Sequence, residues 1–174
     1  MITITGVCHV GVQADDPMAL AAFYRDVFGM TIVDSVPADA PGGAAAFISS
    51  RPDEENHEIA IFRDGRLAHV ALKVGSLADL REAYREITGR GIPITFALNH
   101  GFSLSFYVPD PAGHLLEVYW PPGVQTDRIY GEPVDMTLPA EELLARARAL
   151  ASARGDRSAR HVRRAPRVTL RFRL

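Results

Sequence analysis

The sequence predicts an α+β fold in which two βαβββ modules form a cup-like mixed β-sheet barrel, followed by a C-terminal helix and tail. Three features predict it: an internal repeat at a fixed offset, period-two alternation in the candidate strands, and helix signals at matching places in both copies. The chain has 174 residues, of which 47% are hydrophobic and 23% are charged, so it can bury a core without disulfides.

The repeat has an offset of 60 residues. It relates His9-Val10 to His69-Val70, Leu20 to Leu80, Tyr24-Arg25 to Tyr84-Arg85, and Gly29 to Gly89. One such match is chance, but six at one offset, including matching helix ends, indicate two copies of one unit. Each copy alone would leave an open sheet face. Placing the two side by side around a pseudo-twofold axis closes a cup.

The first module is expected to span 1–63. Period-two alternation predicts a first strand at 2–12. Asp16-Pro17 then supplies an acidic cap and a first-turn proline for a helix that stops at Gly29. Turn-forming residues divide the remainder into three short strands, near 30–36, 44–49 and 57–62.

The second module is expected to span 64–120 and opens at the tight turn Asp64-Gly65. A strand follows at 67–74, and Ser76 can cap a helix that ends at Gly89. The pattern then predicts three strands, near 92–98, 102–108 and 114–120.

Residues 121–174 are expected to form a C-terminal extension outside the two modules. An amphipathic helix is predicted near 138–150, with one apolar face made by Leu143, Leu144, Ala147 and Leu150. An Arg-rich tail follows. Its last part, 168–174, alternates with a period of two and predicts an edge strand.

Charge and composition exclude several classes of function. Residues 146–174 hold ten arginines and one acid, whereas residues 1–145 hold nine basic and 20 acidic residues, a net charge of −11. An acidic body argues against nucleic acid as its ligand. No run of about 18 apolar residues occurs, so no membrane span is predicted. The single cysteine, Cys8, and an N-terminus without signal-peptide features indicate a reducing, cytoplasmic location.

Polar side chains interrupt three apolar strands, at His9, His69 and Glu117. A lone histidine in such a strand is ordinarily a satisfied core residue, but a buried, unpaired carboxylate is costly and needs a cation or strong donors. No lysine or arginine lies within seven residues of Glu117, which favours a metal. The offset of 60 pairs His9 with His69 and also pairs His57 with Glu117. We therefore expect four metal-capable side chains at two symmetry-related pairs of positions inside the cup.

The ligand types limit the choice of metal. Two imidazoles and one carboxylate on one face form the facial triad of non-haem Fe(II) oxygenases, which leaves about three coordination positions open. A closed structural zinc site would want a fourth protein ligand, usually a thiolate. Cys8 is next to His9 and is expected to point to the opposite face of the strand, so it is not counted as a ligand.

Residues 4–120 resemble the vicinal oxygen chelate superfamily, which contains glyoxalase, bleomycin-resistance and extradiol dioxygenase proteins. The stretch 99–120 contains Asn-His-Gly, a tyrosine, Asp-Pro-Ala-Gly and Glu-Val-Tyr-Trp in that order. It is similar to the signature of small single-module extradiol-type catechol dioxygenases, with Asn99 in place of the usual aspartate. Segments 56–62 and 67–71 match the same group.

The resemblance implies that His9, His69 and Glu117 hold the metal, Fe(II) first and Mn(II) second. It also implies the reaction, which is cleavage of an aromatic ring beside a catechol-like vicinal diol with insertion of both atoms of O2. The partners it implies are a small aromatic diol and O2, and a homodimer is a family-level expectation.

The same resemblance gives roles to three further residues. His57 lies where the family places an acid/base histidine beside dioxygen, and His100 lies near the second active-site histidine. Tyr107 matches the tyrosine that hydrogen-bonds a substrate oxygen. A base near the metal suits this chemistry because a catechol must lose protons to chelate a cation.

Two other functions stay open at this point. A metal-dependent isomerase, epimerase or lyase of the glyoxalase type would use four protein ligands, with His57 as the fourth. A drug- or metabolite-binding protein without chemistry would need no metal. In each case the pocket is expected to be lined by Phe47, Ile48, Phe102 and Phe106.

Overall fold

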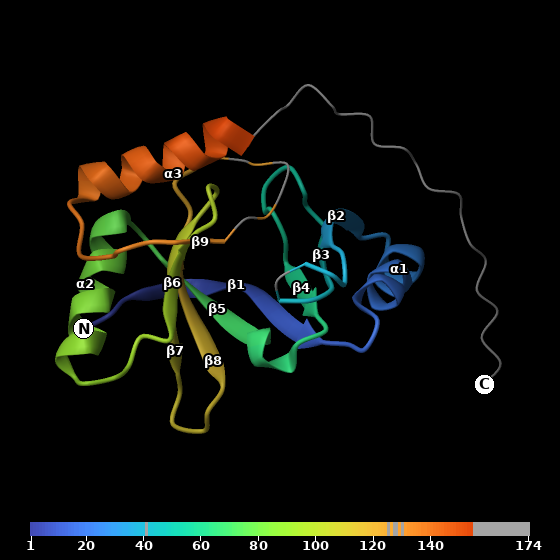
Figure 1. Ribbon diagram of the computed structural model, residues 1–174, viewed down its shortest axis with the longest axis horizontal. Helices are drawn as coiled ribbons and strands as arrows, with labels where there is room; N and C mark the ends of the chain where they lie inside the picture. The colour runs from blue at the N-terminus through green and yellow to red at the C-terminus, as the bar shows by residue number, and fades with distance from the viewer. Residues whose placement is uncertain (41, 125, 127–128, 130, 155–174) are drawn as a thin grey trace.

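The computed structural model describes residues 1–40, 42–124, 126, 129 and 131–154, and it confirms the predicted α+β class. A nine-stranded mixed sheet curls into a half-barrel, and three helices pack on it (Figure 1). The predicted edge strand at 168–174 and most of the Arg-rich tail lie outside the described residues.

The elements follow the predicted order. The first unit contains β1 (Ile4–Gln13), α1 (Pro17–Phe28), β2 (Thr31–Val36), β3 (Ala45–Ser49) and β4 (Ile59–Phe62). A single 3₁₀ turn, Gly65–Leu67, leads to the second unit, which contains β5 (His69–Val74), α2 (Leu77–Gly89), β6 (Phe96–Asn99), β7 (Leu104–Pro109) and β8 (Leu115–Trp120). The extension adds β9 (Glu132–Pro133) and α3 (Ala140–Arg154).

The strands predicted at 92–98 and 57–62 both begin later than their sequence patterns suggest. The strand predicted at 92–98 begins only at Phe96, because Gly91 adopts a positive φ of 74° and Pro93 has no N–H to donate to a neighbouring strand. The strand predicted at 57–62 begins at Ile59, so His57 lies in the preceding loop. That placement lets the His57 side chain turn inward without the constraint of strand alternation.

The residues that the sequence predicts as helix caps do cap α1 and α2 in the structure. Asp16 Oδ1 accepts hydrogen bonds from the backbone N–H groups of Met18 (3.1 Å) and Ala19 (3.0 Å), which have no partner within the first turn of α1. Gly29 ends this helix with a φ of 73°, a conformation that costs glycine little. In α2, Ser76 Oγ accepts from the backbone N–H of Asp79.

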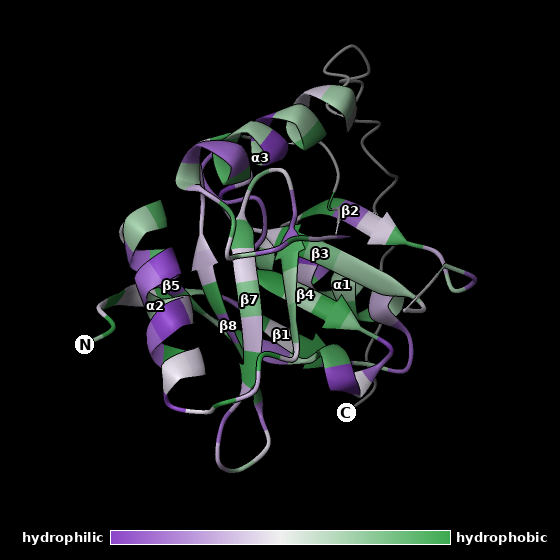
Figure 2. Ribbon diagram, turned by 60° about the vertical axis from the view of Figure 1, so that its left-hand side comes forward, coloured by the Kyte–Doolittle hydropathy of each residue, from purple (hydrophilic) through white to green (hydrophobic). Residues whose placement is uncertain are grey.

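The helices bury their apolar faces against the outside of the curled sheet. Ala21 of α1 packs with Ile48 and Ile61, and Leu80 of α2 packs in a cluster that contains Phe106. The predicted apolar face of α3 joins the second of these clusters through Leu143 and Ala147, both fully buried. Figure 2 shows strands that are largely hydrophobic beneath a hydrophilic outer surface of α2. None of the described helices is both long and apolar enough to cross a membrane.

The strand order of the sheet reflects the internal repeat of the sequence. It runs β2-β3-β4-β1-β5-β8-β7-β6-β9, so the two units are mirrored in order about the β1–β5 pair. β1 and β5 pair antiparallel at the centre, whereas β4 pairs parallel with β1 and β8 pairs parallel with β5. The inner faces of both units therefore meet along β1 and β5, which are the strands that carry His9 and His69.

The strand register corrects one prediction from the repeat. Gly11 of β1 pairs with Ala60, and its equivalent Ala71 of β5 pairs with Glu117. The structural counterpart of Glu117 is therefore Ala60 and not His57. The cause is loop length, because Phe47 pairs with Ala60 whereas its equivalent Tyr107 pairs with Glu117, so the β3–β4 connection has three more residues than the β7–β8 connection.

Candidate metal centre

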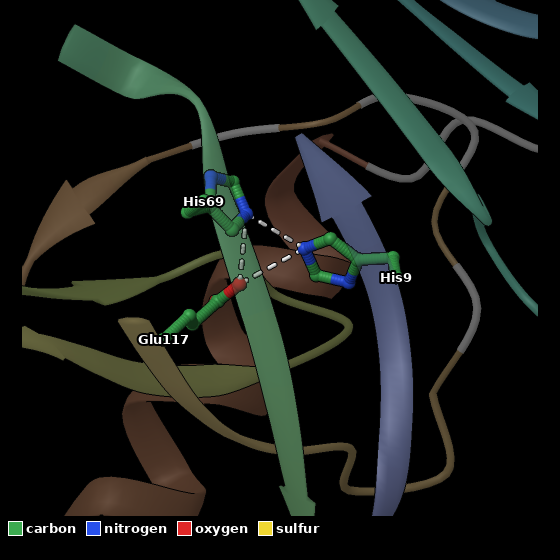
Figure 3. A group of neighbouring side chains, drawn as sticks. All are labelled: His9, His69 and Glu117. Atoms are coloured by element: carbon green, nitrogen blue, oxygen red, sulfur yellow. Dashed lines mark hydrogen bonds and ion pairs between the residues drawn. The ribbon is translucent and has the colours of Figure 1, made fainter. Parts of the chain in front are cut away.

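Side chains from β1, β5 and β8 meet at one point inside the curled sheet (Figure 3). His9 Nε2 lies 2.9 Å from His69 Nε2 and 2.9 Å from Glu117 Oε2, and His69 Nε2 lies 3.2 Å from the same oxygen. All three residues are buried, and Glu117 is only 1% exposed. The three predicted ligands thus come together as a compact cluster.

A small residue in the middle strand makes this convergence possible. Ala71 pairs with His9 on one side and with Glu117 on the other, so these three residues form a row across β1, β5 and β8. His69 precedes Ala71 by two residues and projects from the same face of β5. Because a methyl group stands between the longer side chains, His9 and Glu117 can approach over it.

Backbone contacts orient one of the imidazoles. His69 Nδ1 lies 2.7 Å from the carbonyl oxygen of Leu67, and a carbonyl oxygen can only accept, so this nitrogen carries the proton. The lone pair of His69 is therefore on Nε2, which faces His9 and Glu117. A hydrogen bond of this kind is the usual way in which a protein fixes the tautomer of a metal-binding histidine.

The cluster has the features that a bound cation would satisfy. Glu117 Oε2, the oxygen that faces both imidazoles, is one of several buried side-chain atoms among the described residues that have no hydrogen bond of acceptable geometry. Ligands at about 2.1 Å from a metal and at right angles to each other would be ~3.0 Å apart, which agrees with the separations in the cluster. The ion pairs that the structure shows for Glu117 are all with histidines, and no lysine or arginine of the described residues pairs with it.

Electrostatics link the three groups. Complete burial opposes ionisation of Glu117, but attraction to His9 and hydrogen bonding to His69 outweigh it and hold the pKa of Glu117 well below its ordinary value. Burial lowers the pKa of His69, yet its contacts with Glu117 and the Leu67 carbonyl raise the pKa above 6.5 overall. A cation that binds His69 Nε2 would compete with a proton for the same lone pair.

His57 lies beside this cluster without joining its triangle. Its ring centroid is 4.3 Å from that of His9 and 5.3 Å from that of Phe47. Burial, followed by the proximity of His9, holds the pKa of His57 well below 6.5, so the ring is neutral near neutral pH. His57 Nδ1 lies 3.3 Å from Asn56 Oδ1, and Asn56 Nδ2 donates to the Thr126 carbonyl (3.2 Å).

His100 and Tyr107 lie on the opposite side of Glu117 from β1. Tyr107 is on β7, directly across from Glu117 in the pairing with β8, and its hydroxyl lies 3.3 Å from His100 Nε2. His100 Nε2 is also 4.0 Å from Glu117 Oε1. Burial, reinforced by Glu117, holds the pKa of Tyr107 well above 10, so the phenol stays protonated and can donate.

All six predicted site residues line one cavity of about 340 Å³. Most of the wall is apolar, and its phenylalanines are Phe47, Phe62, Phe96 and Phe102. The prediction that Ile48 and Phe106 also line the cavity is wrong. Ile48 follows the inward-facing Phe47, and Phe106 precedes the inward-facing Tyr107. Because neighbouring residues in a strand point to opposite faces, both side chains pack outward against a helix.

The predicted orientation of Cys8 is also corrected. The β1–β5 pairing shifts register between Val7 and His9, which is a β-bulge at Cys8. Strict alternation fails there, and Cys8 packs against Phe102 and Tyr119, both of which line the cavity. Burial and the nearby Glu55 carboxylate raise the pKa of the Cys8 thiol to about 12, and the thiol lies outside the cluster of candidate ligands.

Asn56 is a further residue near the site that the sequence did not single out, and it joins His57 to Thr126. Tyr119 also lines the cavity, with its ring 5.4 Å from that of His9. Asn56 is adjacent to His57 in the sequence, but no sequence pattern predicts its contact with Thr126, which is 70 residues away.

A polar clamp closes the loop that carries His57. The Glu58 carboxylate accepts from the backbone N–H of Ser50 (2.6 Å), from the Ser50 hydroxyl, and from Arg51 Nη2 (3.0 Å). Glu58 also donates its own N–H to the carbonyl of Ile48. The first and last residues of the 50–58 loop are therefore tied together.

Glu58→Gln is expected to lower the free energy of unfolding by about 1 kcal/mol at pH 7, since it weakens charge-assisted hydrogen bonds. The Ser50 hydroxyl is the main cause of a Glu58 pKa below its ordinary 4.5. A carboxylate with a lowered folded-state pKa stabilises fully above its unfolded pKa, and the stabilisation disappears as pH falls through the folded pKa. Chemical denaturation of both proteins from pH 7 to pH 3 should show the difference shrinking below pH 4.5. A difference that stays constant over this range would contradict the clamp.

Comparison with known proteins places this geometry in a family. The family model described as Glyoxalase/Bleomycin resistance protein/Dioxygenase superfamily matches residues 6–118, which include all six predicted site residues. The chain belongs to this superfamily. Its members include the extradiol dioxygenases and glyoxalases that the sequence resembles.

One relative of the superfamily is biphenyl-2,3-diol 1,2-dioxygenase 3 of Rhodococcus globerulus, 29% identical over 142 residues, which cover 72% of this chain and 70% of the relative. The solved 2,2',3-trihydroxybiphenyl 1,2-dioxygenase of Sphingomonas wittichii has a TM-score of 0.56 at 20% identity. The match covers 74% of this chain and 43% of the solved chain. The Mn(II)-bound glyoxalase of Novosphingobium aromaticivorans has a TM-score of 0.53 at 25% identity, over 80% of this chain and 44% of its own. The chain thus spans less than half the length of these solved superfamily members.

Proposed function

We propose that this superfamily member is an extradiol-type ring-cleavage dioxygenase, which uses a non-haem metal and O2 to open a catechol-like ring. The observation that carries the proposal is a triangle of two imidazole nitrogens and one carboxylate oxygen beside an aromatic-lined cavity. The similarity to biphenyl-2,3-diol 1,2-dioxygenase 3 supports it. A divalent cation, Fe(II) first and Mn(II) second, would serve as a Lewis acid that the diol can chelate, with room left for O2.

The side chains around the triangle suit the proton transfers that the reaction needs. Asn56 Nδ2 donates to the Thr126 carbonyl, so Asn56 Oδ1 faces His57 and accepts from its Nδ1–H. His57 Nε2 is then free to accept a proton. Tyr107, kept neutral by burial, can donate a hydrogen bond to a substrate oxygen, and His100 lies next to its hydroxyl.

The register of the strands favours the dioxygenase over a glyoxalase-type isomerase. An isomerase on this scaffold would use four protein ligands, and the pseudo-twofold relation places the counterpart of Glu117 at Ala60. A methyl group cannot bind a metal. Three protein ligands would leave the open positions that a bidentate diol and O2 require together.

Ala60→Glu tests this reasoning directly. We expect the variant to keep or increase its affinity for a divalent metal but to lose at least about 100-fold in oxygen consumption, because a fourth protein ligand would occupy an open position. Ala60→Leu, which adds similar bulk without a donor atom, should not increase metal affinity. Metal titrations and oxygen uptake on both variants would check the prediction, and unimpaired turnover by Ala60→Glu would contradict it.

The proposed activity is tested by loading metal-free protein anaerobically with Fe(II), or separately with Mn(II), and adding a panel of catechols. Oxygen uptake should occur in a one-to-one ratio with the formation of a ring-opened product that contains both oxygen atoms. Absence of uptake with every diol and both metals would overturn the proposal. The cytoplasmic location and the homodimer remain predictions.

A further inference from the structure

The C-terminal extension contacts both segments that carry the histidines outside the metal triangle. His57 lies in the 50–58 loop, and His100 lies in a turn that its own N–H closes by donating to the Ser103 carbonyl (2.9 Å). The matched family model ends at residue 118, before the extension begins. What the extension does at the site is therefore a property of this chain rather than of the family match.

Thr126, a buried residue of the extension, touches both segments. It is 7% exposed, and its carbonyl accepts a hydrogen bond from Asn56 Nδ2 (3.2 Å). Asn56 Oδ1 in turn lies 3.3 Å from His57 Nδ1. On the other side, Thr126 packs against Gly101, where an added Cβ would lie 3.3 Å from Thr126 Cγ2. One residue thus lies between the neighbours of the two histidines.

The turn that carries His100 is held tightly. Gly101 has a φ of 78°, and its N–H donates to Asn99 Oδ1 (2.9 Å) inside the protein. The last part of α3 lies against the same turn, since a Cβ at Gly101 would lie 3.5 Å from both Cα and N of Ala151. The backbone next to His100 is therefore enclosed by its own hydrogen bonds and by the extension.

Phe102, in the same turn, packs against both imidazoles. Its ring is buried and stacks with that of His100 at 5.7 Å and 27°, and it meets the ring of His57 edge-on at 5.9 Å. Gly131, also in the extension, lies near His100, because a Cβ added there would be 3.8 Å from His100 Cε1. A displacement of the turn would therefore change the packing of both rings.

We propose that Thr126 is a positioning residue for His57 and His100. It holds the first through the Asn56 amide and the second through the Gly101 backbone. The inference rests on the proposed dioxygenase function, which uses these histidines beside the metal. Thr126 acts through its neighbours, because it is not one of the described residues that line the cavity. Position matters to the rate, since a shift of about 1 Å far from the reacting atoms can lower it ~100-fold.

A pair of glycine substitutions separates this role from backbone strain. Gly101 and Gly113 both have a positive φ, 78° and 88°, so alanine strains the backbone at either position. A Cβ at Gly101 presses against Thr126, whereas a Cβ at Gly113 has no listed neighbour within 4 Å. In iron-loaded protein, Gly101→Ala should lower kcat about tenfold with metal affinity unchanged, and Gly113→Ala should stay within about threefold of wild type. Equal kcat values for the two variants would overturn the proposal.

A compensating substitution makes the test specific to Thr126. Thr126→Ser removes only the Cγ2 methyl group and keeps the hydroxyl, so it makes room for the methyl group of Gly101→Ala. The double variant should recover kcat to within about threefold of wild type. A double variant as slow as Gly101→Ala would show that the contact with Thr126 is not what positions His100.

The imidazole ¹H–¹⁵N spectra of the metal-free protein give a readout that needs no turnover. Gly101→Ala should shift the ring signals of both His57 and His100, and the double variant should restore them. Asn56→Ala, which breaks the other contact of Thr126, should reduce the Nδ1-protonated form of His57 and leave His100 unchanged. Unchanged His57 signals in both variants would overturn the proposal. Wild-type protein that is inactive with every diol would overturn the proposed function instead, and the spectra would still decide whether Thr126 positions the histidines.

Discussion

Glu117→Gln is expected to abolish both tight metal binding and oxygen consumption. The substitution removes the one anionic donor of the triangle and leaves a neutral amide 2.9 Å from His9 Nε2. Loss of an outer hydrogen bond to a ligand already weakens metal binding by about 10–100-fold, so loss of a ligand should cost at least the upper figure. Oxygen uptake should fall below detection.

The thermal unfolding temperature gives a readout of this effect that does not depend on turnover. A metal present at about 1,000 times its dissociation constant stabilises the folded state by ~4 kcal/mol. Wild-type protein should therefore unfold several degrees higher after metal addition, whereas a 100-fold loss of affinity leaves Glu117→Gln about 1.4 kcal/mol of stabilisation, so its shift should be no more than about a third as large. Glu86→Gln, which changes a half-buried glutamate on α2 that pairs with Arg90, is the matched control and should behave as wild type. An equal metal-induced shift in wild type and Glu117→Gln would show that the metal lies elsewhere.

His57→Ala is expected to lower oxygen consumption by about 10²–10⁴-fold while the metal stays bound. That range is typical for the loss of a general acid or base, and His57 is next to the triangle without being part of it. Metal content after gel filtration and steady-state oxygen uptake are the two measurements. His114→Ala is the control, because His114 is largely exposed and pairs with Asp110 on the surface.

The two readouts for His57→Ala separate the competing functions. Retained metal with lost turnover agrees with three protein ligands and a separate acid/base histidine. Lost metal would make His57 a fourth ligand, as in the isomerase alternative. In that case the dioxygenase assignment would have to be abandoned.

The sequence alone predicted the architecture because the repeat is strong. His9 and His69 share one offset with the helix ends, and β1 and β5, on which they lie, pair at the centre of the sheet. Glu117 stood out because a carboxylate in an apolar strand is costly without a partner. The architecture, the histidine pair and the unusual glutamate were all inferred from local sequence pattern and from the cost of burying a charge. Both can be read from a sequence without a structure.

The errors share a different physical origin, which is that loops and bulges change register without leaving a clear pattern. Three extra residues in the β3–β4 connection moved the counterpart of Glu117 from His57 to Ala60. A bulge at Cys8 turned its side chain toward Tyr119. The contact between Asn56 and Thr126 joins residues 70 positions apart, which no periodicity encodes.

The proposed function depends most on a single cation held by His9, His69 and Glu117 with vacant positions beside it. Anomalous diffraction at the iron absorption edge, from crystals of the iron-loaded protein, tests this most directly. The predicted result is one peak at about 2.0–2.3 Å from His9 Nε2, His69 Nε2 and a Glu117 oxygen, with the remaining positions filled by solvent. A peak elsewhere, or a fourth bond from His57, would contradict it.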